Sequence, residues 1–353
     1  EIYTLSLHDA LPIYELITIF MRRSPNYAAE RIPCTIFSGN NREPTSGVID
    51  RTPSREQAKL VENIRQHPIP SSLGNTAMTL VEFGNGPSGI TIVYGTGFMG
   101  NPTTTAARLE IARIAEAWRD EEGNPASVLT LPTSSMRESV ADKILATDSF
   151  WPLAEEIAPE LNEHLAYYAD RVGVVGHSFG SRLAAAIPSV LDGPEKRTKF
   201  VAIDDAPSWQ KPLGIFGIAA AQLIETIYLS KYIKHSPDSE AQKAWRENDG
   251  EKMPAVPLLV QLRDVIAMSR GGFVEDLENS LKKLQPGTPV TLFAPELSRM
   301  NDNSPENIRK LITSLSQEFP GLDIRGVLVE DSTHNVSVAN PAYFAQMIEL
   351  SRR

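Results

Sequence analysis

The chain has 353 residues, of which 41% are hydrophobic and 22% charged, a composition typical of a soluble globular protein. Its formal net charge is -10, and its lysines and arginines form no cluster, which argues against nucleic acid as a partner because phosphate binding needs concentrated positive charge. With Cys34 as its one cysteine, the chain can form no internal disulfide and no zinc site built from several thiolates.

The first residues differ from the rest of the chain. Glu1 to Ile13 resemble the translation of sequencing-adaptor DNA, and the apolar stretch from Leu11 to Phe20 lacks the basic flank and cleavage site of a signal peptide. We therefore expect residues 1–23 to be a non-native or disordered segment, and the protein to be cytoplasmic. No strictly apolar run approaches the ~20 residues that a membrane-spanning helix needs, so no transmembrane segment is expected.

The sequence pattern predicts most of the helices and strands beyond residue 75. Residues 24–75 are rich in Pro, Asn, Ser and Gly, and only 54–66 has a helical pattern. Beyond them, short apolar segments predict strands at 79–83, 90–94, 127–131, 172–175, 199–203, 290–294 and 325–329. Segments with a repeating apolar face predict helices at 104–120, 150–168 and 182–191, the second of which we expect to break or kink at Pro159.

Short strands that alternate with helices over this length are typical of a mostly parallel sheet covered on both faces, so the predicted class is α/β. One connection, 206–285, is far longer than a crossover requires. Its sequence predicts helices at 213–233, 239–248, 256–268 and 273–284. We expect a core made of 24–205 and 286–353, with a helical cap at 206–285 inserted after strand 6.

The candidate nucleophile is Ser178, in the sequence Gly-His-Ser-Phe-Gly from Gly176 to Gly180. The pattern G-x-S-x-G alone is a modest signal. Here, however, an apolar strand directly precedes it and a strongly helical segment directly follows, which is the setting that holds a serine out on a strained turn. The alternative interpretation is a glycine-rich turn with an idle serine.

A serine hydroxyl needs a base to remove its proton, and in folds with this strand–turn–helix arrangement the chain order is Ser, acid, His. Of the six histidines, two follow Ser178. His235 falls within the predicted cap, whereas His334 follows the last predicted strand and precedes a terminal helix. We therefore predict His334 as the base, against the alternative of a surface loop histidine.

The acid is less strongly marked. Its task is to accept a hydrogen bond from the imidazole and to stabilise the imidazolium. Asp302, in the loop after the penultimate strand, is our first choice. Asp204 and Asp205, at the end of the strand before the insertion, are the alternatives, and Glu296 is a weaker one. Asp302 could also be present for turn and helix-start reasons alone.

The oxyanion hole needs two backbone N–H groups aimed at the developing negative charge. Phe179, directly after the nucleophile, should supply one of them. Thr96, in the glycine-rich segment Gly95 to Phe98, should supply the other. A phosphate-binding loop is the competing interpretation of that segment, but the segment lacks the G-K-[ST] ending and the dinucleotide-binding spacing.

From about Thr79 to the C-terminus, the sequence resembles the α/β-hydrolase superfamily in its strand order, its single nucleophile turn, its late histidine and the position of its cap. Tyr94 to Phe98 is similar to the family's His-Gly-x-Gly oxyanion segment, with Tyr in place of His. The family often carries its acid shortly after the penultimate strand, where this chain has Ser298. The resemblance therefore implies that the acid is displaced to one of the aspartates named above.

The resemblance implies a carboxylic-ester hydrolase that works through a Ser-His-Asp triad and an acyl-enzyme, with no metal or cofactor. Serine at the turn argues against dehalogenase and epoxide-hydrolase chemistry, which use Asp there. The expected partner is a small or lipophilic ester, because the apolar face of 213–227 could line an acyl pocket, although it could equally pack the cap. The alternatives are a peptidase, an amidase or a C–C bond hydrolase with the same triad, and an inactive binding protein, which Ser298 favours.

Overall fold

The computed structural model describes residues 31–39, 43–50, 64–69, 78–83, 89–97, 104–131, 138–193, 197–207, 209, 217–218, 220–221, 224–225, 266, 272–339 and 343–353. The segment expected at 1–23 and residue His235 lie outside these residues. So do almost all positions of the cap helices expected at 213–233, 239–248 and 256–268.

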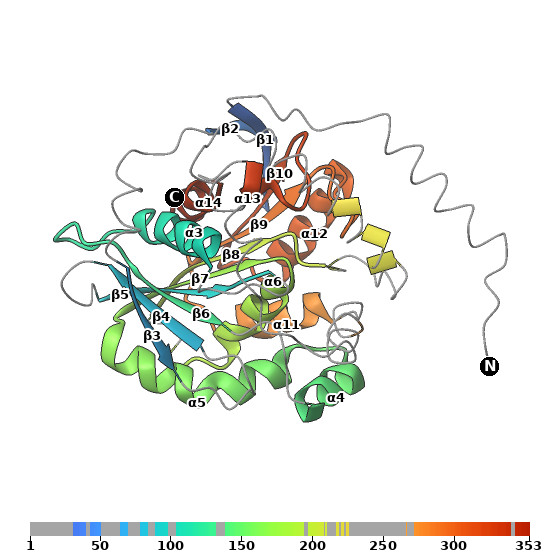
Figure 1. Ribbon diagram of the computed structural model, residues 1–353. Coiled ribbons are helices and arrows are strands. Elements are labelled where there is room, and N and C mark those ends of the chain that lie inside the picture. Colours follow the sequence, from blue (N-terminus) through green and yellow to red (C-terminus); the bar gives the residue numbers. More distant parts are fainter. Residues whose placement is uncertain are drawn as a thin grey trace.

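In the described part of the chain, ten strands form one sheet in the order β2-β1-β10-β9-β8-β7-β5-β6-β4-β3 (Figure 1). They are β1 (Arg31–Ser38), β2 (Thr45–Asp50), β3 (Ile64–Ile69), β4 (Met78–Phe83), β5 (Ile90–Gly95), β6 (Ser127–Leu131), β7 (Arg171–His177), β8 (Thr198–Asp204), β9 (Pro289–Pro295) and β10 (Asp323–Val329). The six strands from β10 to β6 run parallel, and two strands at each edge pair antiparallel. The prediction of an α/β fold with a mostly parallel sheet is confirmed.

Helices cover both faces of this sheet (Figure 1). They are α3 (Thr105–Glu116), α4 (Glu138–Thr147), α5 (Trp151–Tyr168), α6 (Phe179–Ala186), the short η1 (Ile187–Ser189), α11 (Phe273–Leu281), α12 (Pro305–Glu318), α13 (Val336–Ala339) and α14 (Tyr343–Arg352). Side chains alternate along each strand between two buried clusters, so that Val174 joins one and Val175 the other. The first cluster holds α5, α6, α11 and α12, and the second holds α3 and α14.

The parallel strands bring several loops to one edge of the sheet. Because β5, β7, β8, β9 and β10 run in the same direction, their carboxyl ends lie together. The segments that follow four of these ends carry Thr96, Ser178, Asp205 and His334. This edge of an open parallel sheet is where ligands bind in α/β proteins, so the candidate residues converge at the expected place.

Several boundaries differ from the sequence-based expectation. The chain forms β1, β2 and β3 in a region for which the sequence predicts no strand, and the helix expected at 54–66 is wrong at Ile64 to Gln66, which pair with β4. Helix α4 is a further element that the sequence pattern did not predict. The break expected at Pro159 is absent, since α5 is continuous across it. Buried apolar residues every four positions, Leu153, Ile157, Leu161 and Leu165, hold both halves of α5 against the sheet.

Helix α11 lies within the range assigned to the cap. It packs against α6 and η1, and the hydroxyl of Ser280 donates a hydrogen bond of 2.5 Å to the carbonyl of Ala185. Its buried apolar side chains, Phe273, Leu277 and Leu281, belong to the same cluster as those of α5 and α6. This helix therefore contributes to the layer that covers one sheet face. The division of the chain into core and cap stays a prediction.

Candidate active site

Ser178 lies on the sharp turn between β7 and α6. Its backbone has φ 55° and ψ −124°, a strained conformation for a residue with a side chain. The turn is closely packed, since a Cβ on Gly176 would lie 2.6 Å from Cβ of Ala184. A Cβ on Gly180 would lie 2.1 Å from the carbonyl carbon of Gly95. Both flanking positions therefore require glycine, and the turn aims Ser178 away from the end of β7.

Three side chains from three separate loops form a continuous chain of hydrogen bonds. Oγ of Ser178 donates to Nε2 of His334 over 2.7 Å, and Nδ1 of His334 donates to Oδ2 of Asp205 over 2.7 Å. All three residues are buried, with Asp205 fully enclosed. A hydroxyl, an imidazole and a carboxylate joined in this order can remove the proton of the serine and hold the resulting imidazolium.

Asp205 is fixed by more than its contact with His334. Its Oδ1 accepts hydrogen bonds from Nδ2 of Asn301 at 2.9 Å and Nδ2 of Asn303 at 3.1 Å. The hydroxyl of Ser298 donates to Oδ2. Burial raises the pKa of Asp205, but the hydrogen bond and charge of His334, with the bonds from Ser298 and Asn301, hold this pKa below its ordinary value. The carboxylate therefore stays charged beside the imidazole.

The choice of Asp302 as the partner of His334 is wrong. Asp302 is exposed, and its backbone carbonyl accepts a hydrogen bond of 3.2 Å from Nδ2 of Asn307 near the start of α12. The partner is Asp205, one of the two alternatives. Glu296 is also elsewhere, since its Oε2 accepts a hydrogen bond of 3.0 Å from the backbone N–H of Asp331. The physical reason is position: Asp302 serves the turn before a helix, whereas Asp205 leaves the sheet beside β7.

Ser298 stands where α/β-hydrolases often carry an acid, as the resemblance implies. Its hydroxyl donates to the carboxylate of Asp205. Its oxygen also accepts a hydrogen bond of 3.1 Å from the backbone N–H of Met300. The loop after β9 thus contributes a polar contact to the carboxylate that pairs with His334, although that carboxylate comes from the end of β8.

His334 is surrounded by negative charge. Burial disfavours its charged form, but the hydrogen bond and charge of Asp205, followed by the charges of Glu225 and Asp204, raise the pKa of His334 above its ordinary 6.5. Glu225, from the long insertion, is fully buried, and its Oε1 accepts a hydrogen bond of 3.1 Å from the backbone N–H of Arg299. Nδ2 of Asn335 donates to Oε2 of Glu225 over 3.4 Å. The insertion thus places a carboxylate against the loop that carries His334.

Sequence reasoning missed Glu225, Asn301 and Asn303. No local pattern marks them, because their partners are brought together only by the fold. Burial raises the pKa of Glu225 to about 7, against the charge of His334 and the hydrogen bond from Arg299, which lower it.

The two residues predicted to supply oxyanion donors lie close together. Phe179 is the first residue of α6, directly after Ser178. Thr96 follows β5, and a Cβ on Gly180 would lie 2.3 Å from its carbonyl oxygen. The loop after β5 therefore packs directly on the serine turn. Phe98, at the end of the glycine-rich segment, lies outside the described residues.

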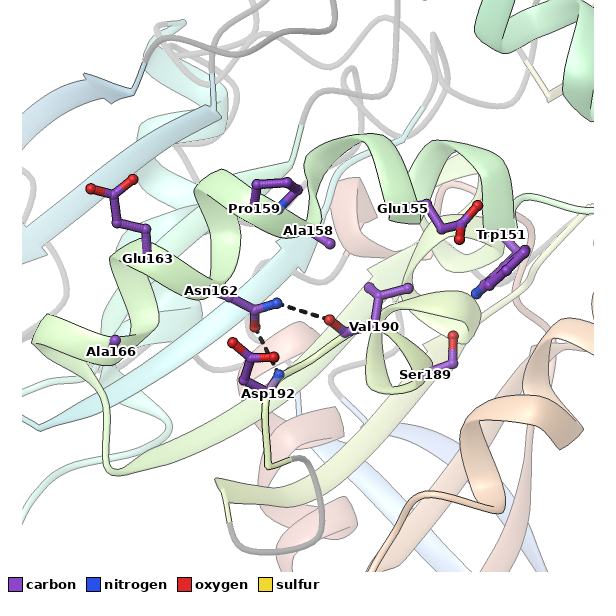
Figure 2. A pocket seen from close by; sticks show the side chains of 10 residues that line it. All are labelled: Trp151, Glu155, Ala158, Pro159, Asn162, Glu163, Ala166, Ser189, Val190 and Asp192. Carbon is purple, nitrogen blue, oxygen red and sulfur yellow. Dashed lines mark hydrogen bonds between the residues drawn. The ribbon is translucent and has the colours of Figure 1, made fainter.

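Three further features of the described residues bear on metals, membranes and pockets. Over the residues with described positions, no group of three or more His, Cys, Asp or Glu could hold a metal ion. Among the helices described, none has the length and apolar character to cross a membrane. A surface hollow of about 670 Å³ lies between α5 and the segment from Ser189 to Asp192, and Figure 2 shows its lining, which includes none of Ser178, Asp205 and His334.

The sequence matches no family model and no curated protein. Among solved structures, the naproxen esterase of Bacillus subtilis is 11% identical, with a TM-score of 0.45 over 83% of this chain and 93% of that one. The carboxylesterase CesB of Bacillus subtilis is 13% identical, with a TM-score of 0.46 over 84% and 94%. The Pyrococcus furiosus esterase Pf2001 is 12% identical, with a TM-score of 0.43 over 85% and 96%.

At these identities and TM-scores the neighbours do not bear on activity, which must be inferred from the contacts of Ser178 and His334. The chain itself carries a parallel sheet, a strand–turn–helix at Ser178 and the order Ser, Asp, His along the sequence. In these features its fold resembles that of the α/β-hydrolase superfamily.

Proposed function

We propose that this protein is a serine hydrolase that cleaves carboxylic esters, with Ser178 as the nucleophile, His334 as the general base and Asp205 as the acid. The observation that carries the proposal is the unbroken hydrogen-bonded chain from Oγ of Ser178 through both nitrogens of His334 to Asp205, each contact 2.7 Å long. Nucleophile and base are within proton-transfer reach, and the base is oriented by a third group.

In the first half of the reaction, Oγ of Ser178 attacks the ester carbonyl carbon while its proton passes to Nε2 of His334. The tetrahedral intermediate collapses as the carbon–oxygen bond to the alcohol breaks and the imidazolium returns that proton to the departing alkoxide. An acyl group is left on Ser178. In the second half, water loses a proton to His334 and attacks this acyl group, which releases the carboxylic acid and restores the serine hydroxyl.

The negative charge on the tetrahedral intermediate needs donors that are in place before the reaction. We assign one donor to the backbone N–H of Phe179, the first residue of α6, because the dipole of a helix favours an anion at its N-terminus. We assign the second donor to the N–H of Thr96, whose loop packs on the serine turn. Removing one such donor typically costs about 10²–10³ in kcat.

Asp205 keeps His334 in the tautomer that has its proton on Nδ1 and its lone pair on Nε2. Its negative charge also stabilises the imidazolium that forms during both halves of the reaction. Three further donors, from Ser298, Asn301 and Asn303, hold the carboxylate in position, so little reorganisation is needed when His334 becomes charged.

The proposal is tested with p-nitrophenyl esters of increasing acyl length, assayed with the full chain and with the Ser178→Ala variant. We expect turnover by the native protein and an initial burst of nitrophenol equal to the enzyme present wherever deacylation is slower than acylation. The variant should release none above background. Equal rates for the native protein and the variant would overturn the assignment. Hydrolysis of p-nitroanilides faster than of the matched esters would move the activity to amide bonds.

A further inference from the structure

A second imidazole–carboxylate pair lies beside the first. Nδ1 of His177 and Oδ2 of Asp204 are 2.7 Å apart, the same distance that separates His334 from Asp205. Asp204 is fully buried, and its other oxygen accepts a hydrogen bond of 2.7 Å from the hydroxyl of Tyr343 on α14. The mechanism above uses neither His177 nor Asp204.

The sheet explains why the two pairs are neighbours. His177 and Ser178 are consecutive at the end of β7, and Asp204 and Asp205 are consecutive at the end of β8. The parallel register aligns His177 with Asp204. Because successive strand side chains point to opposite faces, Asp204 turns toward α14, while Asp205, with φ 44°, leaves the strand toward His334.

The ring of His177 is confined on several sides. Its face stacks on His334, with ring centroids 5.0 Å apart and planes 28° apart. Phe344 meets it edge-on, with centroids 5.4 Å apart. On the side of the oxyanion loop, a Cβ placed on Gly97 would lie 3.3 Å from Cδ2 of His177 and 3.8 Å from Cβ of Ser178. His177 thus lies between the base and the loop proposed to bind the oxyanion.

We propose that His177 is a positioning residue for His334: its imidazole, anchored by Asp204, forms the wall against which the ring of the base stacks. This inference rests on the proposed function, because it concerns the proton transfer from Ser178. The stack limits rotation of the His334 ring about its bond to Cβ, so Nε2 remains on Oγ of Ser178 while Nδ1 remains on Asp205. His177 itself touches neither the hydroxyl nor the reacting carbonyl in this scheme.

The anchoring also fixes which nitrogen of the His177 ring faces Asp204. With Asp204 as acceptor, Nδ1 of His177 carries a proton. The negative charge of Asp204 further favours the charged form of His334.

Two variants separate the contribution of the His177 ring from that of its hydrogen bond to Asp204. His177→Asn keeps an N–H donor near the position of Nδ1 but removes the ring. The double variant His177→Phe with Asp204→Asn keeps an aromatic wall and removes both the hydrogen bond and the buried charge that His177 would leave unpaired. Asp204→Asn alone is the matched control. Circular dichroism and thermal unfolding establish that each variant is folded before its kinetics are compared.

For p-nitrophenyl acetate we expect His177→Asn to lower kcat by ~10-fold or more with KM within about two-fold, because misplacement of a base slows chemistry without weakening binding. The aromatic double variant should recover kcat to within about three-fold of Asp204→Asn, because it restores the wall. Phosphonylation of Ser178 by a fluorophosphonate should follow the same order, which a change confined to substrate binding would not produce.

One result would overturn the inference and leave the proposed function intact: the native protein reacts with the probe, and a folded His177→Asn variant reacts at the same rate. An aromatic variant as slow as His177→Asn also overturns it, because the ring would then not be what matters. A native protein that neither reacts with the probe nor hydrolyses esters overturns the proposed function, and the inference with it. These outcomes differ in the behaviour of the native protein, so the two failures are distinguishable.

Discussion

Two chemically identical pairs, His334–Asp205 and His177–Asp204, have different surroundings. In both pairs Nδ1 lies 2.7 Å from a fully buried carboxylate. In the first, the far nitrogen of the ring contacts Oγ of Ser178 at 2.7 Å. In the second, the ring stacks on the first pair and lies against Gly97. The two pairs differ in what the ring contacts beyond its aspartate: His334 contacts the hydroxyl of Ser178, whereas His177 contacts the ring of His334.

The supports of the two aspartates differ in the same way. Asp205 receives donors from the loop after β9, whereas Asp204 receives the hydroxyl of Tyr343 from α14. Each carboxylate is thus tied to a different layer of the fold. Substitutions on one side should therefore change catalysis far more than the equivalent substitutions on the other.

The largest effect should come from Ser178→Ala, which removes the group that distinguishes the two pairs. We expect kcat for p-nitrophenyl esters to fall by about 10⁶-fold, since triad residues act as a unit. Stopped-flow and long-term steady-state assays of the same preparation measure this loss. A residual rate within about 100-fold of the native rate would contradict the assignment of Ser178 as the nucleophile.

The next largest effect should be that of Asp205→Asn, which keeps the shape but removes the charge and favours the wrong imidazole tautomer. The expected loss in kcat is ~10⁴-fold. Asp302→Asn is the matched control, and it should leave kcat within about two-fold, because Asp302 is exposed and the two nitrogens of His334 are bonded to Asp205 and Ser178. A large loss of kcat in Asp302→Asn with little loss in Asp205→Asn would mean that Asp302, and not Asp205, is the partner of His334 in catalysis.

The dependence of kcat/KM on pH should report the charge around His334. His334 must be neutral to accept the proton of Ser178, and its pKa is raised above 6.5, so activity should rise with pH through a value above 6.5. Glu225, whose own pKa is raised to about 7, is charged over the upper part of this pH range. Glu225→Gln removes this charge, which raises the pKa of His334, so the acid limb should move to lower pH. A pH–rate series on both proteins measures the shift. A move to higher pH would show that Glu225 does not act through its charge.

The smallest expected effect is that of Ser298→Ala. It removes one of several donors to Asp205, and a single hydrogen bond to a charged group is worth ~1.5 kcal/mol or more, or about ten-fold in rate if all of it is lost in the transition state. We expect kcat to fall by up to ~10-fold and KM to stay unchanged. A loss as large as that of Asp205→Asn would mean that Ser298 does more than hold the carboxylate.

The serine and histidine could be predicted from the sequence because each is marked locally. Ser178 lies in a glycine-flanked turn between an apolar strand and a helix, and few histidines follow it. The carboxylate that pairs with His334 could not be predicted, since Asp204, Asp205 and Asp302 all lie near strand ends or turns. What distinguishes Asp205 is its positive φ and its three donors from a distant loop, which only the folded chain provides.

The central strands were predictable for the same reason, since their apolar runs are buried on both faces. The strands β1 and β3 were not. They contain Pro33 and Pro68, and they form because they pair antiparallel with β10 and β4. Local propensity disfavours proline in a strand. Pairing with β10 and with β4 overrides this propensity in β1 and β3.

The most direct test of the triad is the reaction of the folded protein with a fluorophosphonate, with the labelled residue mapped by mass spectrometry. We expect one label on Ser178, with a rate that falls sharply in His334→Ala and Asp205→Asn and stays unchanged in Asp302→Asn. Labelling of another residue, or labelling of Ser178 at equal rates in all four proteins, would contradict the assignment of the triad.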